Sequence, residues 1–246
     1  MTSQGMTEGA AAPEHPVVSH EEWVAARRDF LAKEKEFTRV RDALGRERRA
    51  LPWEEVTEPY AFEGPDGRET LAGLFGPCRQ LLVYHFMFTP EWVEGCPHCS
   101  FWADSFEGIG VHLLQRSTRL VAVSRAPLAK LEAFRRRMGW TFPWYSSGGS
   151  TFNYDYQASF TPEALEGGTA VYNYTRGDPG QPDREGVSAF YKDARGAVFH
   201  TYSSYARGID LLNVAYNFLD LTALGRDEDG LDFTQAWVRH HDRYGA

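Results

Sequence analysis

QLLVYHFMF (residues 80–88) and CPHC (residues 96–99) carry the strongest structural signal in this sequence. The first segment is apolar without alternation, as expected of a central strand that is covered on both faces. Residues 97–115 then predict a helix, and residues 120–124 a second buried strand. Because a strand, a helix and a strand follow one another, we expect two parallel neighbours in one sheet, with the cysteine pair where the helix begins.

The surrounding segments predict one α/β domain over residues 51–246, built on a central mixed sheet. Strands are indicated by β-branched and aromatic runs, and turns by Gly, Pro and Asp. The further expected elements are a hairpin at 60–70, a helix at 126–138 ended by Gly139, an irregular insertion at 140–186, a terminal hairpin at 187–202, a closing helix at 208–221 and a short helix at 232–244.

The N-terminal part differs in character from the rest. Residues 1–18 are small and contain proline, which predicts a disordered leader. Ser19 and Glu22 have the spacing of a capping box, and apolar residues then recur at helical intervals up to Leu44. We therefore expect a helical arm over residues 19–50, which either packs on the core of its own chain or forms a homodimer or another partner contact.

Composition excludes several classes of function. The chain has 246 residues with 35 aromatic side chains (16 Phe, 12 Tyr and 7 Trp), enough to build a folded core. Its net charge of -8 argues against nonspecific nucleic-acid binding, and its short apolar runs argue against a membrane span. Three cysteines and a start without a secretory signal predict a cytoplasmic location. No nucleotide, nicotinamide or flavin motif occurs, so we expect no cofactor.

The cysteine pair predicts thiol-disulfide chemistry. Two cysteines three residues apart at a helix start can approach bonding distance, and the backbone N–H groups there favour a thiolate. We expect Cys96, at the exposed end, to attack and Cys99, one turn into the helix, to resolve the mixed disulfide. His98 lies between them and should stabilise the thiolate, which raises the reduction potential. The expected partner is a protein or small-molecule thiol or disulfide.

Two other interpretations stay open. The cysteines could instead hold copper, zinc or an iron–sulfur cluster, although a zinc site usually needs a second cysteine pair and none occurs. The third interpretation is a non-catalytic interaction domain in which the pair has no chemical role. The state of Cys96 and Cys99 separates these interpretations of the sequence.

Four long segments resemble the bacterial family known as domain-of-unknown-function family 899. They are YHFMFTPEWVEGCPHCSFWADSFEG (84–108), VAVSRAPLAKLEAFRRRMGWTFPWYSS (121–147), GVSAFYKDARGAVFHTYSSYARG (186–208) and YNFLDLTALGR (216–226). The resemblance runs from about Trp23 to the C-terminus. It implies a thioredoxin-like fold and a dithiol-disulfide oxidoreductase activity, and it names no substrate.

The wider thioredoxin resemblance gives three further expectations. Ser188 stands where thioredoxins place a cis-proline facing the cysteines, which weakens the simple reductase interpretation. Copper-delivery proteins of this general fold join a cysteine pair to a distant histidine, which here implies a site of Cys96, Cys99 and His200. Peroxiredoxins place a threonine three residues before the reactive cysteine; here Val93 stands there, which disfavours their peroxidase mechanism.

Aromatic residues on both sides of the pair indicate a cleft wall, although such residues more often belong to the core. Trp92, His85 and Trp102 are the candidates for contact with a substrate. Arg207 is a candidate for recognition of an anionic group, with simple surface placement as the alternative.

Overall fold

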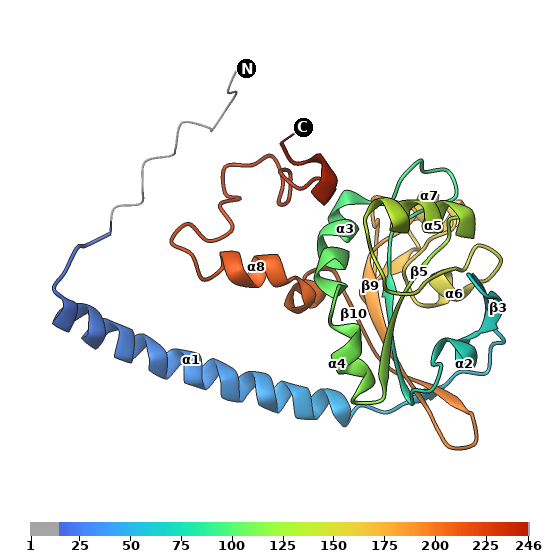
Figure 1. Cartoon of the computed structure of the whole chain (residues 1–246), viewed down its shortest axis with the longest axis horizontal. Coiled ribbons are helices and arrows are strands. Elements are labelled where there is room, and N and C mark those ends of the chain that lie inside the picture. The colour runs from blue at the N-terminus through green and yellow to red at the C-terminus, as the bar shows by residue number, and fades with distance from the viewer. Residues whose placement is uncertain (1–14, 246) are drawn as a thin grey trace. The chain divides into compact units, whose positions relative to one another are not determined.

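A mixed sheet forms the centre of the domain in this computed structural model, which describes residues 15–245 (Figure 1). Its eight strands lie in the order β1-β10-β9-β4-β5-β6-β2-β3. Their bounds are β1 Glu54–Glu55, β2 Ala61–Gly64, β3 Gly67–Thr70, β4 Gln80–His85, β5 Thr118–Ser124, β6 Trp144–Ser146, β9 Gly186–Lys192 and β10 Val198–Tyr205.

The pairing of the inner strands defines the fold. β4 and β5 are parallel, as the strand, helix, strand order predicts. β9 runs antiparallel to β4, and β10 antiparallel to β9. The spatial order is therefore β5-β4-β9-β10, in which two parallel strands are followed by an antiparallel hairpin. This is the arrangement of a thioredoxin-like domain. The predicted fold class is therefore confirmed.

Helices cover both faces of the sheet. Successive side chains of a strand point to opposite sides, and β4 has buried apolar side chains on both sides. From β4, Tyr84 joins a core that also contains residues of α3 and α5, whereas Val83 joins a second core on the other face. The helices are α2 Leu71–Leu74, α3 Pro97–Ala103, α4 Gly110–Leu114, α5 Leu128–Arg137, α6 Phe152–Asp155, α7 Pro162–Glu166 and α8 Val214–Leu219, with 3-10 turns η1 Asp104–Phe106, η2 Ala206–Leu212 and η3 His241–Arg243.

Three predicted helices are wrong in extent. The helix expected at 97–115 is divided into α3, η1 and α4, because Gly108 takes a φ of 78°, which no helix continues through. The helix expected at 208–221 is η2 followed by α8, since Asn213 is extended and its side chain caps α8. Of the segment 232–244, only η3 is helical.

The insertion before the hairpin begins later than expected. Trp144–Ser146 is β6 and pairs in parallel with β5, so this part of the predicted insertion belongs to the main sheet. The remainder holds α6, α7 and a two-stranded hairpin of β7 (Val171–Tyr172) and β8 (Thr175–Arg176).

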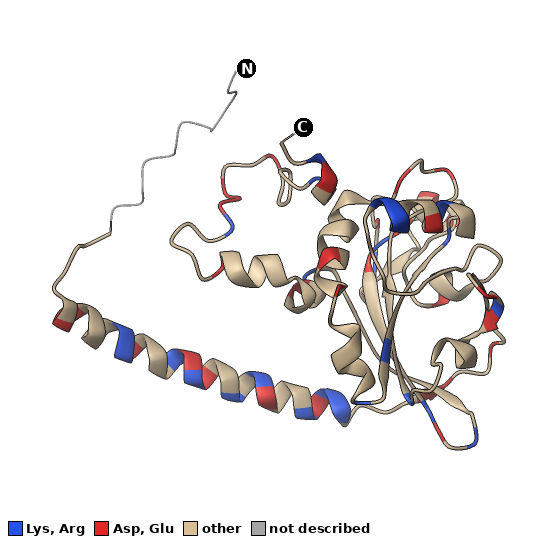
Figure 2. Cartoon of the chain, in the orientation of Figure 1, with Lys and Arg blue, Asp and Glu red and all other residues tan. Residues whose placement is uncertain are grey.

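The N-terminal arm is a separate compact unit: among the described residues, 15–50 form one unit and 51–245 the other. Its helix α1 spans His20–Arg49, and Ser19 and Glu22 form the predicted capping box. Charged residues of both signs alternate along it (Figure 2). Residues 1–14 of the predicted leader lie outside the described residues. Within the described part of the chain, no helix is long and apolar enough to cross a bilayer.

Candidate functional site

Cys96 is placed by the loop that leaves β4 and by the start of α3. It is the N-cap of α3, and Pro97 takes the first helical position, where a missing N–H costs nothing. The backbone N–H of Cys96 donates to the carbonyl of Met87 at 3.1 Å. The Ser100 side chain donates to the carbonyl of Cys96 at 2.9 Å, so both peptide groups of Cys96 are fixed.

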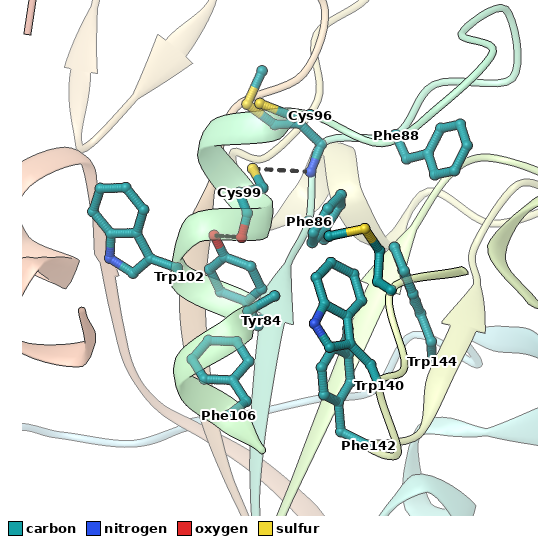
Figure 3. Packing of buried hydrophobic residues seen from close by; sticks show 14 of the residues in the cluster. Tyr84, Phe86, Phe88, Cys96, Cys99, Trp102, Phe106, Trp140, Phe142 and Trp144 are labelled. Atoms are coloured by element: carbon teal, nitrogen blue, oxygen red, sulfur yellow. Dashed lines mark hydrogen bonds between the residues drawn. The ribbon is translucent and has the colours of Figure 1, made fainter. Parts of the chain in front are cut away.

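The two sulfurs have different environments although neither is in a disulfide. A hydrogen bond from the Cys99 thiol lowers the pKa of Cys96 well below its usual value, against the opposing effect of burial. Burial, and then the adjacent Cys96 sulfur, raise the pKa of Cys99 well above its usual value. The Cys99 sulfur also accepts the Met87 backbone N–H at 3.4 Å (Figure 3). Of the two thiols, Cys96 is therefore the more readily ionised.

His98 completes this arrangement. Its imidazole donates a hydrogen bond to the Cys96 sulfur, which raises the pKa of His98 and lowers the pKa of Cys96. The backbone of Gln235 also raises the pKa of His98. His98 also meets the ring of Phe233 edge-on, with 6.3 Å between the ring centroids. The C-terminal segment thus orients the side chain that faces the thiolate.

The cysteines open into a cavity of about 350 Å³. Cys96 is only 7% exposed and Cys99 only 1%, so the expectation that Cys96 lies at an exposed helix end is wrong. The physical reason is that three later segments cover the start of α3: residues 181–185, residues 206–210 and residues 233–235. Besides the two cysteines, the cavity is lined by Met87, His98, Trp102, Gln181, Arg184, Glu185, Ala206, Arg207, Asp210, Phe233, Thr234 and Gln235.

Of the four residues predicted to contact a substrate, Trp102 and Arg207 line this cavity, whereas Trp92 and His85 do not. Trp102 is a buried wall residue whose indole N–H donates to the carbonyl of Ile209 at 3.0 Å. Arg207 lies on η2 and its side chain is 89% exposed at the cavity rim. Trp92 is half-buried and packs against the core instead, outside the lining of the cavity.

His85, Ser188 and His200 lie on the opposite face of the sheet. Ser188 pairs with Val83 in mid-strand, so it shares the far side with that residue and cannot face the cysteines. The ring of His85 shares a hydrogen bond of 2.8 Å with Ser188, which bonds Ser203 at 2.7 Å. His200 also bonds Ser203, at 2.7 Å. These residues form one buried polar chain that does not include the cysteine site.

The expected metal set of Cys96, Cys99 and His200 is therefore wrong as a grouping, because the sheet separates the histidine from the thiols. Across residues 15–245, no three His, Cys, Asp or Glu side chains are arranged to hold a metal ion. His85 is fully buried, and burial lowers its pKa to about 3, so it is neutral.

The sequence did not single out several residues that line the cavity. Gln181, Arg184 and Glu185 come from the end of the irregular insertion, and Glu185, rather than Ser188, is the residue that immediately precedes β9. Phe233 and Gln235 come from a C-terminal segment without regular structure. The only sequence signal for any of these residues was that Glu185 stands directly before the predicted hairpin. It was missed because Ser188 was chosen as the residue that faces the cysteines.

The fold and the site together define a thioredoxin-fold protein with a paired-cysteine site at the start of the helix that follows the first inner strand. Residues 12–244 match the family described as bacterial protein of unknown function (DUF899). The chain belongs to this family, as the sequence resemblance implied.

Solved structures similar to this chain include several peroxiredoxins. A structure of Xanthomonas campestris peroxiredoxin Q has 14% identity and a TM-score of 0.45, with coverage of 69% of this chain and 98% of that one. Mycobacterium tuberculosis peroxidoxin BcpB has 15% identity and a TM-score of 0.42, with coverage of 65% and 91%. No curated protein matches the sequence.

Proposed function

We propose that this protein is a thiol-disulfide oxidoreductase that uses Cys96 and Cys99. The observation that supports the proposal is the unequal state of two adjacent sulfurs: the pKa of Cys96 is lowered and the pKa of Cys99 is raised. A thiolate is the nucleophile of disulfide exchange, whereas a thiol is nearly inert. Cys96 therefore attacks the substrate disulfide, and Cys99 releases the product by attacking Cys96.

Trapping experiments test this assignment. The reduced protein is mixed with a small disulfide, quenched with acid and examined by mass spectrometry. The wild-type protein should lose two hydrogens and form a Cys96–Cys99 disulfide. Cys99→Ser should accumulate a mixed disulfide on Cys96, because the resolving thiol is absent, and Cys96→Ser should form almost none.

Cys78→Ser is the matched control, because Cys78 is also buried but lies outside the cavity. It should behave like the wild type. A mixed disulfide that forms on Cys99 or Cys78 would contradict the proposed roles. One equivalent of bound copper, zinc or iron that is lost in Cys96→Ser, found by elemental analysis of anaerobically purified protein, would favour the metal-binding alternative instead.

We also propose that two copies associate through α1. Trp23, Phe30, Phe37 and Leu44 repeat every seven residues, and each is more than half exposed. A seven-residue apolar repeat is the pattern of helices that coil around each other. A cytoplasmic location, where thiols stay reduced, remains part of this proposal.

A further inference from the structure

Access to Cys96 is restricted by three segments. α3 provides the floor, the residues before β9 (181–185) and the 3-10 turn η2 provide two walls, and residues 233–235 provide the third. The cavity volume of about 350 Å³ is at the lower end of the range of small-molecule sites. A disulfide in a folded protein would have to bring its surrounding surface into this space to reach a sulfur that is 7% exposed.

The wall at residues 233–235 is held in place. The Glu228 carboxylate accepts hydrogen bonds from the Trp237 indole at 2.7 Å and from the backbone N–H of Gln235 at 3.1 Å. Further along, His240 is buried and its ring bonds the carbonyl of Gly95 at 2.9 Å. The Glu228 bonds hold the segment in its own conformation, and the His240 bond ties it to the loop before α3.

The wall before β9 is held by a buried ion pair. The Asp183 carboxylate bonds Ser159 at 2.7 Å and Arg125 at 2.7 Å, and all three side chains are buried or nearly so. Fixing Asp183 also fixes the two residues that follow it, Arg184 and Glu185, which face the cavity.

Two guanidinium groups on these walls have capacity for an anion. The Arg184 Nε donates to the carbonyl of Pro179 at 2.6 Å, and its guanidinium lies 5.7 Å from the centroid of the Tyr172 ring, with no ion pair to a carboxylate among residues 15–245. Arg207 makes only a 3.4 Å contact with Asp210, and Asp210 also pairs with Arg226 at 3.1 Å. Arginine binds carboxylates by donating paired N–H hydrogen bonds, so Arg184 and Arg207 can each bind a carboxylate of a ligand.

We propose that the substrate is a low-molecular-weight disulfide that carries carboxylates, of the kind made by amino acids or short peptides. This proposal rests on the proposed function. The small cavity selects against disulfides of folded proteins, and Arg184 and Arg207 bind the carboxylates while the disulfide lies against Cys96.

The reaction balances within the protein and this substrate. The Cys96 thiolate attacks one sulfur of R–S–S–R, so the substrate S–S bond breaks, one thiolate leaves and takes a proton from solvent, and a Cys96–S–S–R bond forms. Cys99 then loses its proton and attacks the Cys96 sulfur, which releases the second thiolate. The dithiol gives two electrons to the substrate, and a small dithiol such as dithiothreitol restores the reduced protein.

Single-turnover kinetics test the substrate class. The reduced protein is mixed separately with oxidised glutathione, with cystamine, which has no carboxylate, and with insulin as a protein disulfide. Each rate is divided by the rate at which mercaptoethanol reacts with the same disulfide. Oxidised glutathione should be at least about tenfold faster than the other two on this scale, because charge-assisted hydrogen bonds hold its carboxylates, and tenfold corresponds to about 1.4 kcal/mol.

Variants identify the residues responsible. Arg184→Gln and Arg207→Gln should each slow the reaction with oxidised glutathione by about three- to tenfold, and neither should slow the reaction with cystamine, whose two ammonium groups the arginines repel. Arg195→Gln is the matched control, because Arg195 is exposed in the turn between β9 and β10, outside the cavity. It should change neither rate.

The outcomes separate the two proposals. If no disulfide oxidises the Cys96–Cys99 pair, the proposed function fails. If the Cys96–Cys99 disulfide forms, two results overturn the substrate class and leave the proposed function standing. One is that insulin or cystamine reacts fastest, and the other is that the arginine variants react with oxidised glutathione like the wild type. A hydroperoxide that oxidises Cys96 faster than every disulfide would overturn the proposed function itself.

Discussion

At the scale of single residues, the lowered pKa of Cys96 predicts a distinct pH dependence of its reactivity. An ordinary cysteine, with a pKa of about 8.5, loses its thiolate as the pH falls below that value. The pKa of Cys96 is lowered, so its thiolate should persist to lower pH than that of an ordinary cysteine and be lost as the pH falls through the lowered pKa. Alkylation of Cys99→Ser by iodoacetamide, followed across pH, should therefore have its midpoint at lower pH than alkylation of a free cysteine.

The Cys99→Ser background isolates Cys96 but also removes the hydrogen bond from the Cys99 thiol, the largest cause of the lowered pKa. A serine hydroxyl can donate in its place. Cys99→Ala cannot, and its alkylation midpoint should lie at higher pH than that of Cys99→Ser. Equal midpoints near the ordinary value for cysteine in both variants would contradict this account of the site.

His98 should set the reduction potential of the pair. The imidazole stabilises the Cys96 thiolate, which exists only in the reduced protein, so it favours reduction and makes the pair more oxidising. His98→Ala should therefore lower the potential by a few tens of millivolts, since about 30 mV corresponds to 1.4 kcal/mol for two electrons. Equilibration with a glutathione redox buffer measures this quantity.

The control for this measurement is His112→Ala, because His112 is an exposed histidine on α4 and does not line the cavity. Its potential should equal that of the wild type. A His98→Ala potential that is unchanged or higher would remove the tuning role and would leave the assignment of Cys96 and Cys99 intact.

The residues of the site could be predicted in proportion to how local their signal is. Cys96, His98 and Cys99 stand within four positions, and their spacing alone indicates the chemistry. Glu185 could not be found in this way, because its place beside the cysteines depends on where β9 begins. Ser188 shows the consequence: placing it opposite the cysteines required the register of β9 on β4, which only long-range pairing determines.

At the scale of the elements, the packing of α5 against the sheet predicts a measurable contribution to stability. Leu131 is fully buried in the core that also contains Phe86 and Phe134. Leu131→Ala removes this burial and leaves a cavity, which typically costs about 2–5 kcal/mol. Urea unfolding, followed by tryptophan fluorescence, should show the midpoint shift to lower urea.

Leu221→Ala makes the same chemical change at a side chain that is 83% exposed, and its unfolding free energy should change by no more than about 0.5 kcal/mol. Comparable losses in the two variants would show that α5 does not pack as described.

Elements were predicted well where one physical signal was dominant. α1 follows from a capping box and a helical period, and β4 from an unbroken apolar run. The helices near the site were predicted too long, because a glycine or an asparagine inside an apolar pattern does not by itself tell whether the chain continues as a helix. At Gly108 and Asn213 the chain turns, and these turns allow η2 and α8 to pack beside α3 (Figure 1).

At the scale of the whole molecule, the sheet order follows from the sequence more directly than the enclosure of the site does. A strand, helix, strand unit and a terminal hairpin leave few possible arrangements. The cavity wall at residues 233–235 depends instead on hydrogen bonds made by single side chains such as Glu228 and His240. The sequence of this segment has no period, so its return to the cysteines was not predictable.

The last prediction concerns self-association through α1. If the stripe of Trp23, Phe30, Phe37 and Leu44 forms the interface, the wild-type protein should sediment as a dimer. Phe30→Glu/Phe37→Glu should then weaken the dimer by about a hundredfold or more, because each buried Phe contributes about 1.5–3 kcal/mol. Ala25→Glu/Ala32→Glu adds the same two charges to the opposite side of the helix and should remain dimeric. Analytical ultracentrifugation over a concentration series distinguishes these results: a wild-type monomer, or equal weakening in both double variants, would exclude this interface, and the chemistry of Cys96 and Cys99 would be unaffected.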